Sequence, residues 1–143
     1  MKSITRAIRL GLAFTAAFAF TASGPLHAAQ PAPDKGPGQT YLAYRAAVQK
    51  AKAIEDLAPW LAKDSRAMID ETPADERPML FGMLQDMSGA MTDLKILNEK
   101  VDGETAELAV EAMADGAKTK GTVSMTKEDG AWRLVTERWG SGM

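Results

Sequence analysis

The sequence predicts an α+β fold in which N-terminal helices pack on one face of a four-stranded antiparallel meander sheet. The middle of the chain has an apolar periodicity of helical type, whereas its C-terminal third alternates apolar and polar residues. Asp-Gly pairs at residues 102–103, 115–116 and 129–130 divide the alternating region. Such pairs favour tight hairpin turns, because these turns need positive φ at their central residues.

The first 28 residues are typical of a cleavable secretory signal. Three basic residues precede an apolar stretch from Leu10 to Ala22, and Ala28 supplies the small residue of a cleavage site. The stretch is shorter than the roughly 20 residues that a permanent membrane span needs. We therefore expect a periplasmic or secreted protein with no membrane attachment after cleavage.

Composition excludes several kinds of site. The only histidine, His27, lies within the expected signal, and the chain has no cysteine. The exported part would therefore lack disulfides, zinc sites built from these residues, and Ser-His or Cys-His nucleophilic pairs. It would also carry more acidic than basic residues, which argues against contact with nucleic-acid phosphates. We expect no cofactor, no resident metal and no nucleic-acid partner.

The exported part divides into three segments. Residues 29–39 contain three prolines and two glycines without periodicity, which predicts a flexible linker. Residues 40–139 are expected to form a single α+β domain, and residues 140–143 a tail.

The first helix is expected at about residues 40–52. Tyr41, Tyr44 and Val48 recur on one face of this helix, which predicts that the face is apolar and packs inward. Arg45 is expected to lie away from that face.

Two further helices follow from a repeated pattern, an aspartate with a proline three residues later. The aspartate can cap a helix, and the proline then falls where its backbone needs no donor. The first pattern predicts a helix over about 57–71, interrupted near Lys63–Ser65. The second predicts a helix over about 76–88 that ends at Gly89.

The three turns define four strands. Their expected ranges are 93–101, 104–113, 118–127 and 131–139. Alternation along these strands directs one set of apolar side chains to a common buried face beneath the helices. This set comprises Leu108, Val110, Val123, Met125, Trp132 and Leu134.

The register of the strands also follows from the turns. Two-residue turns at the second and third Asp-Gly pairs set apolar residues opposite one another on one face and opposite charges on the other. The first hairpin matches this pattern only with one extra residue, so a bulge near Asp102-Gly103 is expected to place Ile96 opposite Leu108. The other predicted pairs are Leu108–Val123, Ala106–Met125, Met125–Leu134, Lys127–Trp132 and Glu111–Lys120.

The order of elements, the turn segment Asp102-Gly103-Glu104-Thr105-Ala106 and the closing Asp-Gly-x-Trp-Arg-Leu stretch resemble small exported members of the nuclear-transport-factor-two-like (cystatin-like) superfamily. The resemblance covers about residues 38–139. It implies a cone-shaped fold whose sheet wraps around the first helix and leaves an apolar mouth. The superfamily includes isomerases, dehydratases, transport factors and uncharacterised secreted domains, so the fold alone does not choose a function.

The leading hypothesis is an exported, non-catalytic binding domain. It would hold a small apolar ligand in the cone-like pocket, or a protein partner on the sheet. The residues expected to contact the ligand are Tyr41, Tyr44, Trp132 and Met83. Trp139 is assigned by parity to the face opposite Trp132, where a partly exposed indole suits a partner contact.

Two alternatives stay open. Tyr41 or Tyr44 with a carboxylate such as Asp70 or Asp93 would suit an isomerase- or dehydratase-like enzyme, although packing of the first helix against the sheet is the favoured interpretation of the two tyrosines. Methionine-based Cu(I) binding is the other alternative, because Met79, Met83 and Met87 share one helical face and thioethers are soft ligands. The same spacing suits a core-facing stripe, which is the interpretation that periodicity favours.

Overall fold

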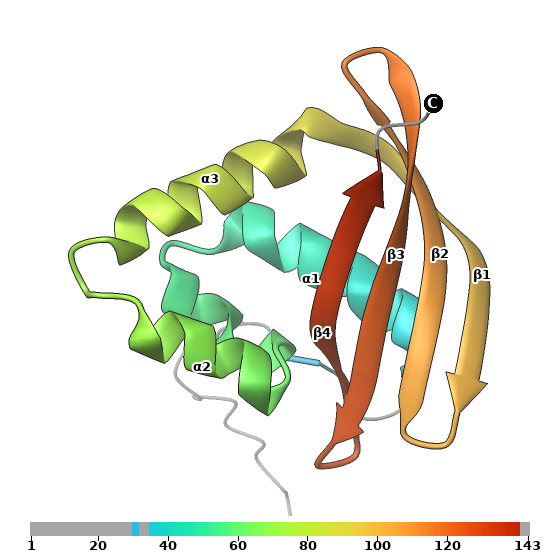
Figure 1. Cartoon of the computed structure of the whole chain (residues 1–143), viewed down its shortest axis with the longest axis horizontal. Coiled ribbons are helices and arrows are strands. Elements are labelled where there is room, and N and C mark those ends of the chain that lie inside the picture. The colour runs from blue at the N-terminus through green and yellow to red at the C-terminus, as the bar shows by residue number, and fades with distance from the viewer. Residues whose placement is uncertain (1–29, 32–34, 141–143) are drawn as a thin grey trace, which may run out of the picture.

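The computed structural model describes residues 30–31 and 35–140. Four helical segments precede a sheet whose antiparallel strands follow in the order β1-β2-β3-β4. All four helical segments lie on one side of the curved sheet, and α1 runs across it (Figure 1). The predicted α+β fold is therefore confirmed. The segments are α1 (Pro37–Lys50), the 3-10 helix η1 (Ile54–Trp60), α2 (Lys63–Glu71), α3 (Arg77–Ala90), β1 (Met91–Asp102), β2 (Thr105–Ala114), β3 (Ala117–Glu128) and β4 (Ala131–Gly140).

The expected signal, residues 1–28, lies outside the described residues, as do 32–34 of the expected linker and 141–143 of the expected tail. Within the described ranges, no helix has the length and apolar character required to cross a membrane.

Helix α1 begins earlier than predicted. Pro37 occupies its first turn, where a missing backbone N–H costs nothing, and the Thr40 hydroxyl donates to the carbonyl of Gly36 at 2.9 Å. Residues 37–39, assigned to the linker from their composition, are therefore helical. Arg45 is buried, so the expectation that it lies away from the packed face is wrong.

The predicted helix over 57–71 consists of two pieces. Asp56 accepts hydrogen bonds from the backbone N–H groups of Lys52 and Ala53, and this stabilises the start of η1. The chain is then extended at Leu61 and Ala62, and the N–H of Ala62 donates to the Leu134 carbonyl of β4 at 2.8 Å. This contact with the sheet edge interrupts the helix slightly before the predicted point.

Helix α3 does not end at Gly89. It continues to Ala90 and passes directly into β1, so no separate loop needs a glycine there. Its core contacts are made by Phe81 and Ser88, which are buried, with Leu84 packed partly against the core. The methionines lie on the other side and are exposed, so the expectation of a core-facing methionine stripe is wrong.

The second and third hairpins have the predicted turns. Asp115 and Asp129 have φ values of 51° each, and the glycines that follow have φ values of 76° and 78°. Positive φ at both central residues is the type I′ geometry. The resulting pairs agree with the prediction: they are Leu108–Val123, Ala106–Met125, Met125–Leu134, Lys127–Trp132 and Glu111–Lys120.

The first hairpin, between β1 and β2, does not have the predicted turn. Asp102 pairs directly with Thr105, and only Gly103 has a positive φ in this turn, 59°. A glycine at the first central position is the type II′ arrangement, which moves the turn along by one residue and needs no bulge beside it. The irregularities of β1 lie farther from the turn, so Ile96 is opposite Val110 and the predicted pairing with Leu108 is wrong.

Strand β4 contains a bulge that the alternation pattern did not predict. Ser124 pairs with Thr136 while Met125 pairs with Leu134, which leaves Val135 as the extra residue. The side-chain parity reverses at this point. Trp139 therefore faces inward, like Trp132, and packs partly buried against the core, so the assignment of the two tryptophans to opposite faces is wrong.

The core lies between α1, η1 and the inner face of the sheet. All six strand residues predicted for this face are buried. Tyr41, Val48 and Leu57 fill the helical side, and Trp60 and Trp132 close the end near the third hairpin.

Candidate functional site

The structure separates the residues predicted to bind a ligand. Tyr41 and Tyr44 lie together, with ring centroids 6.3 Å apart, and Trp132 belongs to the same buried cluster. Met83 does not join them, because it lies on the exposed side of α3. Since the Tyr41 side chain has no exposed surface, a ligand could touch it only if the core opened.

The core residue Tyr41 forms a buried polar cluster with Arg45 and Glu137. The Tyr41 hydroxyl donates to Glu137 Oε2 at 2.7 Å, and Arg45 Nη1 donates to Glu137 Oε1 at 3.4 Å. Arg45 Nη2 also donates to the Ser88 carbonyl of α3 at 3.2 Å. The side chains of Arg45 and Glu137 are only 8% and 11% exposed. The polar cluster thus joins α1, α3 and β4.

The electrostatics of this cluster keep both tyrosines neutral. Burial, followed by the negative charge of Glu137, raises the pKa of Tyr41 far above its ordinary value near 10. The same two causes raise the pKa of Tyr44. Each carboxylate oxygen of Glu137 accepts a hydrogen bond from within the cluster, so the carboxylate is held between Tyr41 and Arg45.

Sequence reasoning paired the tyrosines with the wrong carboxylates. Asp70 and Asp93 are exposed, and the carboxylate that contacts Tyr41 belongs to Glu137. Glu137 faces inward only because of the bulge at Val135. The adjacent apolar residues Leu134 and Val135 break the alternation of β4, and this was the signal that marked the change of phase.

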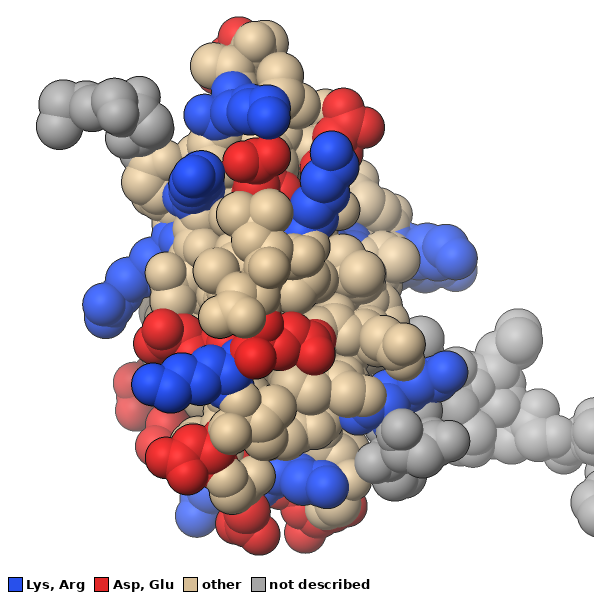
Figure 2. Space-filling model, turned by 90° about the vertical axis from the view of Figure 1, so that its right-hand side faces the viewer, with Lys and Arg blue, Asp and Glu red and all other residues tan. Residues whose placement is uncertain are grey.

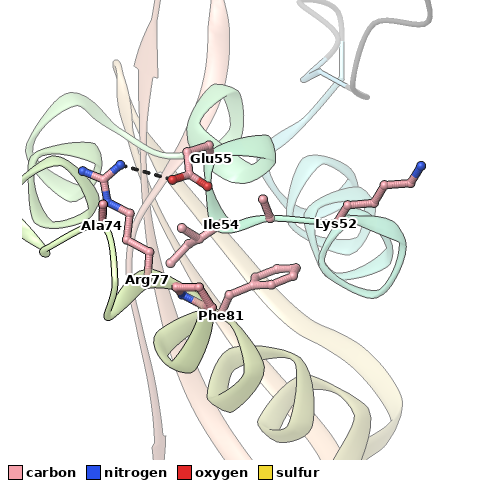
Figure 3. Close-up of a pocket in the computed structure, with 8 residues that line it drawn as sticks. Lys52, Ile54, Glu55, Ala74, Arg77 and Phe81 are labelled. Carbon is pink, nitrogen blue, oxygen red and sulfur yellow. Dashed lines mark hydrogen bonds and ion pairs between the residues drawn. The ribbon is translucent and has the colours of Figure 1, made fainter.

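A small hollow of about 160 Å³ lies between the segment that follows α1 and the beginning of α3. Ile54 and Phe81 form its apolar wall, whereas Lys52 extends away from it (Figure 3). Arg77 points toward Glu55 at 3.1 Å and also donates to the Thr72 carbonyl at 2.9 Å. The guanidinium is thus bound by the protein itself, and the hollow is lined by both apolar and charged side chains.

The side of α3 that faces away from the core carries a row of apolar side chains. We define the α3 outer face as Met79, Leu80, Met83 and Met87. The three methionines are 67%, 64% and 43% exposed. Their positions at i, i+4 and i+8 place them along successive turns of one side of the helix.

The outer surface of the sheet has a different character. Lys, Arg, Asp and Glu side chains are interspersed over the side of the molecule shown in Figure 2, without a large area of one sign. Lys118 and Glu111 make an ion pair of 3.5 Å on this surface. Within residues 30–31 and 35–140, no group of three histidine, cysteine or acidic side chains is placed to hold a metal ion. The α3 outer face is therefore the more distinctive surface.

The comparisons with known proteins assign no family. No family model and no curated protein matches the chain. A designed protein with a curved β-sheet is 15% identical, with a TM-score of 0.35, over 47% of this chain and 58% of its own. An NTF-2-like protein of unknown function from Silicibacter pomeroyi is 27% identical, with a TM-score of 0.36, over 45% of this chain and 56% of its own.

A SEC-C motif containing protein from Rhodopseudomonas palustris is 14% identical, with a TM-score of 0.38, over 68% of this chain and 70% of its own. The chain spans a little more than half the length of the first two neighbours. One structural neighbour is thus NTF-2-like, but the similarity covers less than half of this chain and carries no functional assignment.

Proposed function

We propose that this chain is an exported, non-catalytic domain of the NTF-2-like kind that binds a protein partner through the α3 outer face. The observation that carries the proposal is the exposure of its three methionines, the least of which is 43% exposed. The opposite side of the same helix supplies the core contacts, so folding does not account for this row. Clustered apolar side chains on a surface often mark interaction sites, and methionine adapts readily to different partners.

The interior gives less support to the alternative of a small apolar ligand in a cone-like pocket. Tyr41, Tyr44 and Trp132 pack into the core, and Tyr41 is entirely covered. The hollow near Phe81, at about 160 Å³, would hold a ligand no larger than about the size of benzene. A protein partner on an open face needs no such interior space.

The charges beside the α3 outer face indicate the chemistry of the partner. Glu76 precedes Met79 by three residues and Asp86 follows Met83 by three, so each acid is a neighbour on the helix surface. Both are exposed, and the basic residue of α3, Arg77, is paired with Glu55. We infer that the partner presents a short apolar segment flanked by lysine or arginine.

Site-specific photo-cross-linking in the producing cell tests this proposal. A benzoylphenylalanine at Met83 should give a discrete adduct, whereas the same probe at Lys118, on the outer surface of the sheet, should give none. Met79→Lys should abolish the adduct by placing a charge one turn away, and the matched Met79→Leu should preserve it. Equal adducts at both probe positions, or an adduct that survives Met79→Lys, would contradict docking on this face.

A Tyr/carboxylate enzyme is the second candidate, favoured by the 2.7 Å hydrogen bond between Tyr41 and Glu137. Such a site needs a hydroxyl and a carboxylate that can reach a substrate. Here they are bonded to each other, and Tyr41 is fully buried. If the chain turns over an enolisable substrate, Tyr41→Phe should abolish the activity while the fold persists. Unchanged turnover in Tyr41→Phe would remove this candidate.

A further inference from the structure

We propose that Met79, Met83 and Met87 also form a site for a soft monovalent metal ion, Cu(I), bound through their thioether sulfurs. This site goes beyond the docking role proposed above, because it depends on sulfur chemistry and not on apolar surface. Thioethers favour Cu(I) over hard cations such as Mg²⁺ or Ca²⁺.

The exposure of the methionines removes the competing explanation for their spacing. A stripe at every fourth residue is ordinarily a core stripe, but here Phe81 and Ser88 make the core contacts of α3. Met79 and Met83 keep about two thirds of their surface in solvent, at 67% and 64%. Three thioethers in a row are thus available to a ligand.

The helix geometry allows neighbouring methionines to share one ion. Residues four apart rise about 6 Å along a helix and lie on the same side. Methionine has three rotatable side-chain bonds, so two sulfurs at this separation can turn toward a common point. Met83 has such a neighbour on either side, which makes it the central ligand of the row.

The local charges favour a cation. Asp86, three residues after Met83, is exposed. Arg77, the basic residue of α3, forms an ion pair with Glu55 at 3.1 Å. Met87 lies in the last turn of α3, where the backbone carbonyl dipoles favour positive charge. The chain has no cysteine and only one histidine, His27, so stronger soft or imidazole ligands do not compete within residues 35–140.

Competition with a coloured Cu(I) chelator under reducing, oxygen-free conditions tests the site. The exported protein should withdraw Cu(I) from a weak chelator such as ferrozine. Met83→Leu should weaken binding by about tenfold or more, since even the hydrogen-bond partners of metal ligands are worth that factor. Met68→Leu is the matched control, because Met68 is 67% exposed but lies on α2.

A second readout locates the ion. On titration with Ag(I), a redox-stable substitute for Cu(I), the methyl carbon signals of Met79, Met83 and Met87 should shift, while those of Met68 and the buried Met125 stay in place. Failure to withdraw Cu(I), or equal affinity when all three methionines are leucine, would overturn the metal site. Because the cross-linking probe replaces Met83, docking is tested separately with Met79→Leu and Met87→Leu, which keep the face apolar and should preserve the cross-link.

Discussion

Helices α1 and α3 differ in the side chains that they bury: α1 buries a charged residue, whereas α3 exposes apolar ones. Helix α1 buries Arg45 beside Glu137, whereas α3 leaves Met79, Met83 and Met87 in solvent. A charge is buried stably only when a partner accompanies it, and the β4 bulge supplies that partner by turning Glu137 inward. The methionines lack any element of the described chain that covers them. Burial therefore depends on what the neighbouring elements present, as well as on the polarity of the residue.

Removal of Glu137 is expected to have the largest effect on stability. Glu137→Ala would leave Arg45 buried without its carboxylate and the Tyr41 hydroxyl without its acceptor. Breaking a buried ion pair in this way costs about 3–5 kcal/mol of unfolding free energy. Urea denaturation of the purified protein measures it. Glu137→Gln keeps an acceptor for Tyr41 and should lose less; equal stability of the alanine variant and the parent would refute a stabilising role for the polar cluster.

The sequence predicted the sheet well where turn chemistry and alternation agree. Asp115-Gly116 and Asp129-Gly130 both adopt the positive φ values that Asp-Gly favours, and this fixes the register of β2, β3 and the first part of β4. At Asp102-Gly103 the same dipeptide forms another turn, because Gly103 alone takes the positive φ. A dipeptide restricts the turn types, but contacts along the strands select among them.

The polar cluster was not predictable from alternation alone. A period of two placed Trp139 outward and gave Glu137 no inward role, whereas one extra residue at Val135 reverses both assignments. The burial of Arg45 was not predictable for a related reason, because the groups that accept its hydrogen bonds belong to β4 and α3, which are distant from it in sequence. The exposure of the methionine face of α3 could not be predicted, because helical periodicity identifies an apolar face but does not show whether another element covers it.

The next largest effect is expected at alkaline pH, where ionisation of the buried tyrosines should lower the free energy of unfolding. The two tyrosines are the only ones in the chain, and burial raises the pKa of both above the unfolded value near 10. Folding therefore favours the neutral phenol. The contribution of the neutral phenols to the free energy of unfolding is fully present below about pH 10. Above that pH it is lost, at about 1.4 kcal/mol per tyrosine for each pH unit.

Absorbance at 295 nm, which reports tyrosinate, measures this directly. It should rise in the same cooperative step as the loss of far-ultraviolet circular dichroism. Gradual titration near pH 10 in the folded protein would show that Tyr41 and Tyr44 reach solvent, contrary to their burial.

A pair of glycine substitutions compares the sheet with α3. Gly121 lies opposite Trp139, and a Cβ there would be 2.7 Å from the Arg138 carbonyl oxygen and 2.8 Å from the indole ring. Gly121→Ala should cost about 1–3 kcal/mol by overpacking. At Gly82 in α3 a Cβ would meet nothing within 4 Å, so Gly82→Ala should stabilise by about 0.5–1 kcal/mol. Thermal unfolding distinguishes the two signs, and destabilisation at Gly82 would mean that α3 is covered there.

Oxidation of the methionines should affect stability least. A hydroperoxide transfers one oxygen atom to a thioether, which becomes a sulfoxide while the peroxide leaves as water or an alcohol. Met79 and Met83, at 67% and 64% exposure, should react well before Met125, which is 2% exposed. Peptide mapping by mass spectrometry gives the order, and equal oxidation of Met125 would contradict the contrast between core and outer face.

The unfolding curve of the oxidised protein shows whether oxidation of the methionines has destabilised the fold. Since surface changes remain within about 0.5 kcal/mol, partial oxidation confined to α3 should leave the unfolding curve almost unchanged. A sulfoxide is polar, however, and removes both the apolar surface and the thioether. Oxidation should thus abolish Cu(I) binding by the parent chain and the cross-link of the chain with the probe at position 83, at constant stability, whereas Met79→Leu and Met87→Leu should weaken only metal binding.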